Sequence, residues 1–456
     1  MSSRTMSFRT FVALPLLVAG FLLLPFFAIA QTSAQKPMGL DVRLANPVMI
    51  AGGKQQNYLR VALNGCEPKR SDHRNPVNVA FVIDRSGSMA GQRIAQAREA
   101  AILALRRLDQ ADIASVVIFD NQVDVLAPAQ PVANPDHFID LVRGITVRGS
   151  TAIYDGVMQG AREVRKFKDA RRLNRVVLLS DGLANVGPKQ PEEFARLGRD
   201  LLAEGISVST IGLGLEYNED LMLALARAAD GNHAFASVPN DLIQIFNREF
   251  DDVLAACAQT VSIDVELAPG ARVVRALSRD GSVEGSRASF TLNQVYAATE
   301  HYVLLEVEFD GKASATTADL GRVSVSYTAP DSTERQTMQA SIGGQFTTSV
   351  DAVKAGQDKA VMEAVVQQVT RERAQAAVKL RDQGKGAEAA KLFQQNAQEI
   401  GAYLATAPKP SPALQSLQSQ YGTFAKTAPS APASVLNTER KLLRQIESGA
   451  AGGARY

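Results

Sequence analysis

The chain has 456 residues, a length sufficient for more than one globular domain. Its content of 46% hydrophobic and 21% charged residues is typical of globular proteins. It carries 49 Lys and Arg against 47 Asp and Glu, and without residues 1–30, which contain Arg4 and Arg9, the two totals are equal at 47. A neutral chain has no basic field to attract a phosphate backbone. The composition therefore argues against nucleic acid as a partner.

The N-terminal segment 1–30 has the pattern of an export signal. Arg4 and Arg9 precede an uncharged apolar run from Phe11 to Ala30, which ends in the small residues that a signal peptidase requires. We expect cleavage after Ala30, with an uncleaved membrane anchor as the alternative, because a run of about twenty residues can span a bilayer. In both cases the remaining chain is exported, so the predicted location is periplasmic, cell-envelope associated or secreted.

Residues 38–68 contain two strand patterns, Asp41–Leu44 and Asn57–Leu63, separated by a glycine pair at 52–53. Two strands cannot bury a core alone, and their open edges would invite aggregation. We therefore expect these strands to pair with strands from elsewhere in the chain.

The segment from residue 76 to residue 257 alternates strand and helix patterns. Strands are predicted at Val79–Asp84, Ile113–Phe119, Val176–Ser180 and Ile206–Leu213, with a short antiparallel edge strand at Val123–Leu126. Helices are predicted at Gln92–Leu108, Ala152–Phe167, Glu193–Leu202, Asp220–Ala229 and, closing the segment, Asp241–Ala256. This alternation predicts an α/β domain with a mainly parallel, Rossmann-like sheet and helices on both faces.

The loop after the first of these strands offers Asp84, Ser86 and Ser88 at alternate positions. One carboxylate and two hydroxyls suit a small, oxygen-seeking cation such as Mg²⁺, which is rarely enclosed completely by protein ligands. The same residue types are also common in turns and as helix N-caps, so the triplet alone is weak evidence.

Two later loops strengthen the interpretation as a metal site. Thr151 precedes a predicted helix, and Asp181 follows an apolar strand. In such sheets the loops at the carboxyl ends of the strands meet at one edge, so these residues are expected to converge on the first loop. The three loops together resemble the metal-ion-dependent adhesion site of von Willebrand factor type A domains. The resemblance implies five metal-site residues, Asp84, Ser86, Ser88, Thr151 and Asp181.

The resemblance also implies a function. The serines and the threonine bind the cation (Mg²⁺, or Mn²⁺ or Ca²⁺) directly or through water, and the aspartates act largely through bridging waters. An acidic residue of a protein partner then completes the coordination, in adhesion or in the assembly of an envelope complex. The alternatives are a structural or regulatory subunit in which the metal mainly stabilises the fold, and a metal-dependent hydrolase. We expect no enzyme, because the sequence contains no zinc-binding H-E-x-x-H, phosphate-binding loop or nucleophile elbow.

The two cysteines, Cys66 and Cys257, bracket this domain. The termini of a compact domain commonly lie close together, and an exported protein meets an oxidising compartment, so we predict a disulfide between them. The alternative is a pair of unrelated buried thiols. Related A domains sometimes carry such a bond.

Residues 258–346 have the alternating pattern of antiparallel strands. The predicted strands are Val261–Leu267, Val273–Leu277, Ala288–Leu292, Tyr302–Phe309 and Val323–Tyr327. With residues 38–68 they should form one β-sandwich into which the α/β domain is inserted. This arrangement resembles bacterial exported proteins similar to the inter-alpha-trypsin inhibitor heavy chains.

The composition changes again after residue 350. A helical hairpin, Ala352–Arg381 and Gly386–Ala405, is predicted within residues 350–406. Residues 407–456 are predicted to form a linker, a short helix and a flexible tail, because they contain two proline-rich stretches and a glycine-rich end.

Overall fold

The structure is a computed structural model. It describes residues 38–67, 76–169, 171–181, 183–214, 217–236, 241, 244–245, 255–313, 316–329, 332, 334–407, 411–451 and 454–455. All of these belong to the second of the two units into which the chain divides, Met1–Gln35 and Lys36–Tyr456. The predicted signal or anchor segment lies outside the described residues. Within the described part of the chain, we find no helix with the length and apolar character needed to cross a membrane.

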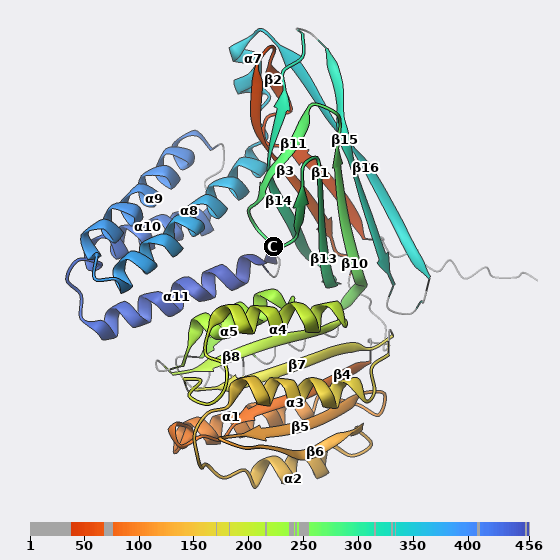
Figure 1. The fold of residues 1–456 in the computed structure, drawn as a ribbon, viewed down its shortest axis with the longest axis vertical. Coiled ribbons are helices and arrows are strands. Elements are labelled where there is room, and N and C mark those ends of the chain that lie inside the picture. The colour runs from red at the N-terminus through yellow and green to blue at the C-terminus, as the bar shows by residue number, and fades with distance from the viewer. Residues whose placement is uncertain are drawn as a thin grey trace, which may run out of the picture. The chain divides into compact units, whose positions relative to one another are not determined.

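The α/β domain contains a six-stranded sheet with the order β6-β5-β4-β7-β8-β9 (Figure 1). All neighbouring pairs are parallel except β5 and β6. The strands are β4 (Val77–Asp84), β5 (Ile113–Phe119), β6 (Val123–Pro131), β7 (Leu173–Ser180), β8 (Ile206–Leu213) and β9 (His233–Ala236). Every residue of β4, β5, β7 and β8 is buried, which is typical of parallel strands covered on both faces and explains the apolar runs in β4, β5 and β7. The fold class predicted from the sequence is confirmed.

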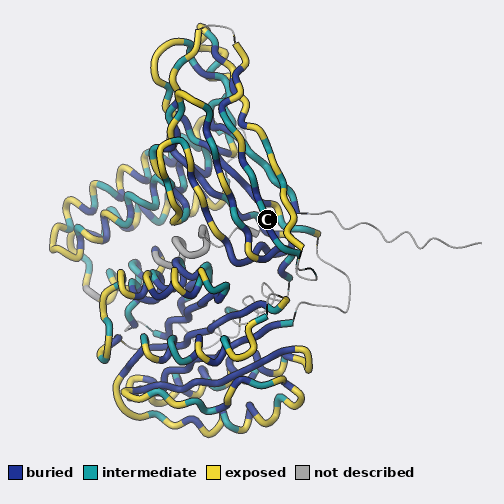
Figure 2. Tube along the Cα trace, turned by 45° about the vertical axis from the view of Figure 1, so that its right-hand side comes forward, coloured by how far each residue is buried: buried dark blue, intermediate teal, exposed yellow. Residues whose placement is uncertain are grey.

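Helices cover both faces of this sheet. The elements are η1 (Gly87–Met89), α1 (Gln92–Leu105), α2 (Pro135–Arg143), α3 (Ile153–Arg165), α4 (Pro191–Ala203) and α5 (Glu219–Ala228). Phe81 packs in the core beneath α1 and α2, whereas its neighbour Val82 packs in the core beneath α3, α4 and α5. Figure 2 shows the buried strands between helices with exposed outer faces. The helix α2 was not predicted. The predicted closing helix Asp241–Ala256 lies mostly outside the described residues, and Ala256 belongs to strand β10 instead.

Two glycines let α3 lie unusually close to the sheet. A Cβ atom on Gly160 would lie 2.5 Å from Val82 Cγ2, and one on Gly156 would lie 2.9 Å from Phe119 Cδ1. Larger residues at these positions would push the helix outward. The close contact holds the start of α3, and therefore the loop before it, against the edge of the sheet.

Strands on both sides of the α/β domain in the sequence form two further sheets. The first has the order β1-β3-β14-β11 and consists of Gly39–Leu44, Lys54–Asn64, Thr299–Asp310 and Ala271–Ala276. The second has the order β12-β13-β10-β15-β16-β2 and consists of Ser282–Glu284, Arg287–Tyr296, Ala256–Leu267, Thr317–Thr328, Arg335–Thr347 and Val48–Ile50. Both sheets contribute to one apolar core, so the α/β domain is inserted into a sandwich built from two chain segments.

The strands β2, β12 and β16 were not predicted. The long strand β16 is polar along much of its length, contains Gly343 and Gly344, and has most of its residues partly or fully exposed. Its apolar residues Met338, Ala340, Ile342 and Phe346 nevertheless alternate with polar residues or glycine, which is the pattern of a half-buried strand. The strand pairs with β15 along most of its length and with β2 at its end.

The C-terminal region is more extensively helical than predicted. The helices are α7 (Val350–Ala355), α8 (Lys359–Asp382), α9 (Gly386–Thr406), α10 (Pro412–Thr427) and α11 (Ala433–Ala451). The first predicted helix is interrupted because Asp358 caps a new one, accepting a hydrogen bond from the N–H of Val361 at 3.0 Å. The prediction of a linker, a short helix and a flexible tail at 407–456 is wrong. Pro412 occupies the first turn of α10, where proline is well tolerated, and Tyr421 is buried against Phe393.

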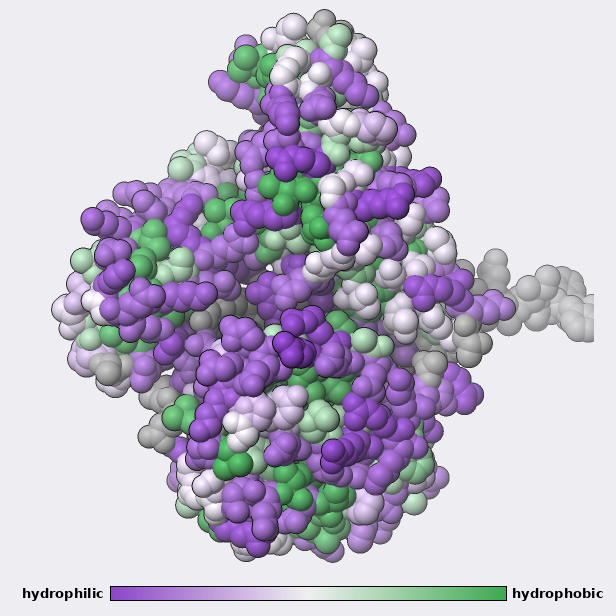
Figure 3. All heavy atoms as spheres, in the orientation of Figure 1, coloured by the Kyte–Doolittle hydropathy of each residue, from purple (hydrophilic) through white to green (hydrophobic). Residues whose placement is uncertain are grey.

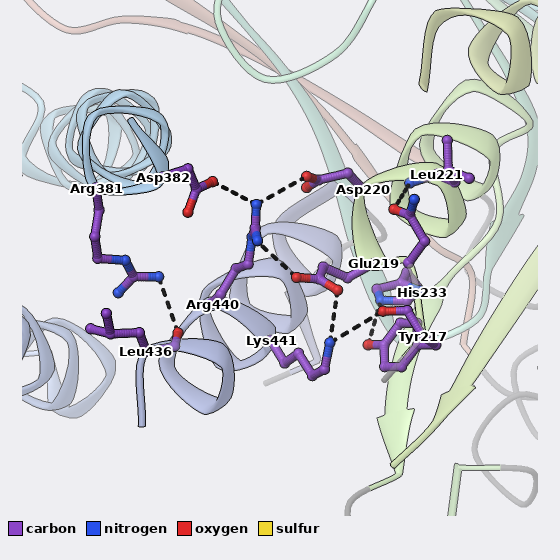
Figure 4. A network of polar contacts seen from close by, with 11 residues as sticks. Tyr217, Glu219, Asp220, Leu221, His233, Arg381, Asp382, Leu436, Arg440 and Lys441 are labelled. Carbon is purple, nitrogen blue, oxygen red and sulfur yellow. Dashed lines mark hydrogen bonds and ion pairs between the residues drawn. The ribbon is translucent and has the colours of Figure 1, made fainter. Parts of the chain in front are cut away.

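Helix α11 connects the helical region with the α/β domain through charged side chains (Figure 4). Lys441 Nζ lies 2.7 Å from Glu219 Oε2 and 4.3 Å from the centre of the Tyr217 ring. Arg440 Nε lies 3.1 Å from Glu219 Oε1, and the same guanidinium reaches Asp382 on α8. We call Tyr217, Glu219, Arg440 and Lys441 the α11 cluster.

Candidate metal site

The predicted metal residues lie at the carboxyl ends of β4 and β7. These strands are parallel neighbours, with Ile83 opposite Leu179, so Asp84 and Asp181 reach the same edge of the sheet. Thr151 enters from the loop before α3. The arrangement places the three predicted loops, which are far apart in the sequence, at one position.

The first loop is organised around Asp84, which is fully buried. Its Oδ1 accepts a hydrogen bond from the N–H of Ser86 at 2.8 Å, and its Oδ2 accepts one from the hydroxyl of Ser180 on β7. Ser86 Oγ lies 3.0 Å from Ser88 Oγ, and the Ser88 hydroxyl donates to Asp181 Oδ1 at 2.8 Å. A continuous chain of polar contacts therefore links the first loop with the third. Ser88 is exposed to solvent.

The Thr151 loop is bonded to both of the others. The N–H of Gly87 donates to the carbonyl of Gly149 at 3.1 Å. The N–H of Thr151 donates to Asn185 Oδ1 at 2.7 Å, and the N–H of Asn185 donates to the carbonyl of Thr151 at 3.2 Å. The Thr151 hydroxyl has no hydrogen-bond partner among the described residues, which leaves its oxygen available to a ligand.

A second group of charged side chains, centred on Asp120, connects the first two loops. The fully buried Asp120, at the end of β5, accepts hydrogen bonds from Arg148 Nε at 2.8 Å and forms an ion pair with Arg85 Nε at 2.8 Å. Burial opposes ionisation of Asp120, but the hydrogen bonds from Arg148 and from the N–H of Gln122 outweigh it and lower the pKa. Arg85 and Arg148 belong to the first and second loops, so Asp120 joins these loops electrostatically.

The two site carboxylates differ in their charge partners. Asp181 forms an ion pair with Arg93 Nη1 at 2.6 Å. For Asp84, the described residues provide hydroxyl and backbone donors but no ion pair. Burial raises the pKa of Asp84 to about 6, against the opposing hydrogen bonds from Ser180 and Ser86. A cation in these loops would favour the ionised form.

The oxygen donors brought together here fit a hard divalent cation. Two carboxylates and three hydroxyls match the preference of Mg²⁺, Mn²⁺ or Ca²⁺ for oxygen. Among the described residues there is no group of three or more His, Cys, Asp and Glu that could hold a metal ion, so a site rich in nitrogen or sulfur ligands is not found there. The structure gathers all five predicted residues, and their role as metal ligands stays a prediction.

Four neighbouring residues were not identified from the sequence. Three of them contact the predicted ligands directly, namely Arg93, Ser180 and Asn185. The fourth, Asp120, pairs with Arg85 and Arg148 in the neighbouring loops. Ser180 and Asp120 follow the rule that polar residues at strand ends lie at the ligand edge, which could have identified them. The side chains of Arg93 and Asn185 carry no comparable pattern, because their partners are set by the folded loops.

Cys66 and Cys257 lie together where the chain leaves and re-enters the sandwich. The N–H of Cys66 lies 3.0 Å from Cys257 Sγ, and both cysteines are half-buried thiols in this structure. The hydrogen bond with the Cys66 side chain and then burial raise the pKa of the Cys257 thiol. The proximity permits a disulfide, which stays a prediction.

The von Willebrand factor type A domain family model matches residues 78–248. These residues form a von Willebrand factor type A domain. The A domain coincides with the α/β domain described above and contains all five predicted metal residues.

Parts of the chain are also similar in sequence to known proteins. An uncharacterized protein of Synechocystis sp. is 28% identical over 51% of this chain and 55% of its own length. Inter-alpha-trypsin inhibitor heavy chain H3 of Homo sapiens is 30% identical over 35% of this chain and 19% of its own length. The chain thus spans about half of the first relative and about a fifth of the second.

Two solved structures resemble nearly the whole chain. The von Willebrand factor type A protein from Catenulispora acidiphila has a TM-score of 0.72 at 14% identity, covering 93% of this chain and 99% of that one. The ArnB paralog VWA2 from Sulfolobus acidocaldarius has a TM-score of 0.61 at 16% identity, covering 91% and 100%. At these identities the likeness shows the fold. Domains of this type are typically protein-interaction or adhesion modules and are generally non-enzymatic.

Proposed function

We propose that this protein is an exported module that binds a protein partner through a divalent cation. Mg²⁺ is the first candidate ion, with Mn²⁺ or Ca²⁺ as alternatives. The ligands are Asp84, Ser86, Ser88, Thr151 and Asp181. The observation that carries the proposal is the chain of contacts from Ser86 through the exposed Ser88 to the buried Asp181.

The chemistry of these donors explains why a partner would be needed. Hydroxyl oxygens neutralise none of the charge of the cation, and carboxylates that act through bridging water neutralise it weakly. The cation therefore remains electrophilic toward an acidic side chain. Because Ser88 is exposed, such a side chain of a partner can approach from solvent. The partner is expected to carry a carboxylate that completes the coordination.

The surface character supports a polar mode of recognition. Figure 3 shows a face on which hydrophilic side chains predominate and apolar ones form scattered patches. Large continuous apolar patches are typical of permanent interfaces. On the visible face, a contact centred on a cation and a carboxylate is therefore more consistent with the surface than a broad apolar interface.

Calorimetric titration with Mg²⁺ tests the metal site. We expect Asp84→Ala and Thr151→Ala to abolish binding while circular dichroism stays unchanged, because Asp84 is the last residue of β4 and Thr151 lies in the loop before α3, both at the sheet edge. Asp140→Ala is the matched control, since that acid has a side chain 74% exposed on α2. Unaltered Mg²⁺ affinity in both site variants would contradict the assignment.

The partner hypothesis needs a second experiment. We expect envelope extract to yield a protein that the wild type captures with Mg²⁺ but not with a chelator, and that Asp84→Ala does not capture. Capture that is independent of metal would favour the alternative, a structural or regulatory subunit in which the ion only stabilises the fold. Metal-dependent turnover of a substrate would favour the hydrolase.

Export is tested by cell fractionation followed by mass spectrometry of the N-terminus. The sequence pattern of residues 1–30 supports release of a protein that begins at Gln31. A full-length protein in the membrane fraction would support the anchor. A full-length protein in the cytoplasm would contradict export.

A further inference from the structure

We propose that Arg93 is an internal competitor for the divalent cation and couples cation binding to partner binding. This inference rests on the proposed metal site and concerns its regulation. Arg93 lies in the first turn of α1, directly after the loop that carries Ser86 and Ser88. Its Nη1 donates to Asp181 Oδ2 at 2.6 Å and to the carbonyl of Ser88 at 3.2 Å.

Donors of the protein itself occupy both oxygens of the Asp181 carboxylate. Oδ1 accepts the Ser88 hydroxyl at 2.8 Å, and Oδ2 accepts Arg93. Because Asp181 is fully buried, its negative charge requires a nearby positive charge. Arg93 supplies that charge. A divalent cation at the same carboxylate must therefore either displace Arg93 or bind against its repulsion.

The surroundings of Arg93 allow it to withdraw. Its side chain is 34% exposed, whereas that of Asp181 is 0% exposed, so the guanidinium has solvent on one side. Part of its remaining surface lies against backbone: a Cβ atom on Gly214, after β8, would lie 3.4 Å from the Arg93 Nη2.

Displacement has a consequence for the partner. Once the cation holds Asp181, the guanidinium of Arg93 lies beside the cation and no longer pairs with Asp181. The carboxylate of a partner can then bind the cation and pair with Arg93. Each event favours the other, so the cation alone should bind weakly and the cation with an acidic partner should bind more strongly.

Charge-removing variants at Arg93 test this inference in the full chain. We expect Arg93→Gln and Arg93→Met to bind Mg²⁺ on the order of tenfold more tightly than the wild type in calorimetry, because the competing charge is removed from a partly solvated position. Their metal-free melting temperatures should fall, because Asp181 is left buried without its ion pair. Arg93→Lys should stay close to the wild type.

Lys189→Gln is the matched control, because it removes one positive charge from the loop that carries Asp181 at an exposed position. We expect little change in Mg²⁺ affinity for this variant. A tightening equal to that of Arg93→Gln would show a general effect of surface charge and overturn direct competition. If the wild type binds Mg²⁺ and neither charge-removing variant binds it more tightly, Arg93 is not a competitor and the metal site stands. If neither the wild type nor any variant binds Mg²⁺, the metal site itself is wrong.

Discussion

Two clusters of buried charge involve residues of the A domain and differ in how their carboxylates are paired. In the α11 cluster, Glu219 is paired with both Lys441 and Arg440 (Figure 4). In the metal loops, Asp84 and Asp181 are both fully buried, and Arg93 is the one basic side chain that forms an ion pair with either of them among the described residues. In the first cluster the buried carboxylate is paired with two basic side chains, whereas in the second Asp84 has no ion pair among the described residues.

The difference separates a structural role from a binding role. Both clusters contain buried carboxylates, so burial of a carboxylate does not by itself identify a binding site. The α11 cluster connects helices and has Lys441 buried with only 2% of its side chain exposed. The metal loops end in the exposed Ser88 and leave Asp84 without a cation. A buried acid that lacks a cationic partner, next to an exposed hydroxyl, is what a cation-binding site requires.

The strongest test separates the two clusters physically. A fragment of residues 76–257 retains the metal loops and loses α11, which returns Glu219 to water instead of leaving it buried and unpaired. We expect this fragment to fold and bind Mg²⁺, as measured by circular dichroism and calorimetry. Residues 258–345 alone should aggregate or stay unfolded, because β14 loses its partner β3, whose Leu59, Val61 and Leu63 are fully buried.

A soluble monomer of residues 258–345 with a cooperative melt would show that the sandwich does not need the N-terminal strands. Failure of the A-domain fragment to fold would instead show that the α11 cluster is essential to it. The first result would contradict the proposed assembly of the sandwich, and the second would contradict the independence of the metal loops from the α11 cluster.

The next largest effect should come from the α11 cluster itself. Glu219→Ala leaves Lys441 buried without its acid and should cost about 3 kcal/mol of stability. Lys441→Met should cost about 1 kcal/mol or less, because Glu219 keeps Arg440 at 3.1 Å and the methionine fills a similar volume. Thermal or denaturant unfolding of the full chain gives both values. Equal losses would mean that Arg440 does not support Glu219.

The junction between sandwich and A domain should contribute less. We expect Cys66 and Cys257 to form one intrachain disulfide in protein from its native compartment, as shown by peptide mapping without reductant. The bond closes a loop between residues 191 positions apart and should stabilise the protein by about 2 kcal/mol relative to Cys66→Ser, less than an ideal chain-entropy argument gives. Two cysteines that alkylate freely in the folded, unreduced protein would contradict the prediction.

The smallest effect on stability is expected at Asp84. Asp84→Asn removes a buried charge that has no cationic partner among the described residues, so the metal-free protein should change by less than about 1 kcal/mol or become more stable. The stabilisation by Mg²⁺ in a thermal melt should disappear at the same time. A loss as large as that of Glu219→Ala would mean that Asp84 is balanced within the protein, which would remove the contrast between the clusters.

The sequence by itself determined the elements whose pattern is local. Strand β5 is buried on both faces, so its mainly apolar run predicts its bounds directly. The alternation of Asp84, Ser86 and Ser88 after such a strand likewise predicts where the polar side chains lie. Parallel strands present their carboxyl ends at one edge, which is why the loops of Asp84 and Asp181 could be placed together from the sequence. The loop of Thr151 joins α2 to α3, so this rule does not place it.

The tertiary structure decided the contacts between distant residues that follow no such rule. Ser88 and Asp181 are 93 positions apart, and Arg93 and Asp181 are 88 apart. The hydrogen bonds that join them depend on the directions of side chains in the folded loops. The order of residue types along the sequence does not determine these directions. The same reason applies to α11, whose Lys441 contacts Glu219 across 222 positions. Residue types along the chain predict which groups can bind a cation. Only the fold decides which of those groups are already paired with a basic side chain of the protein.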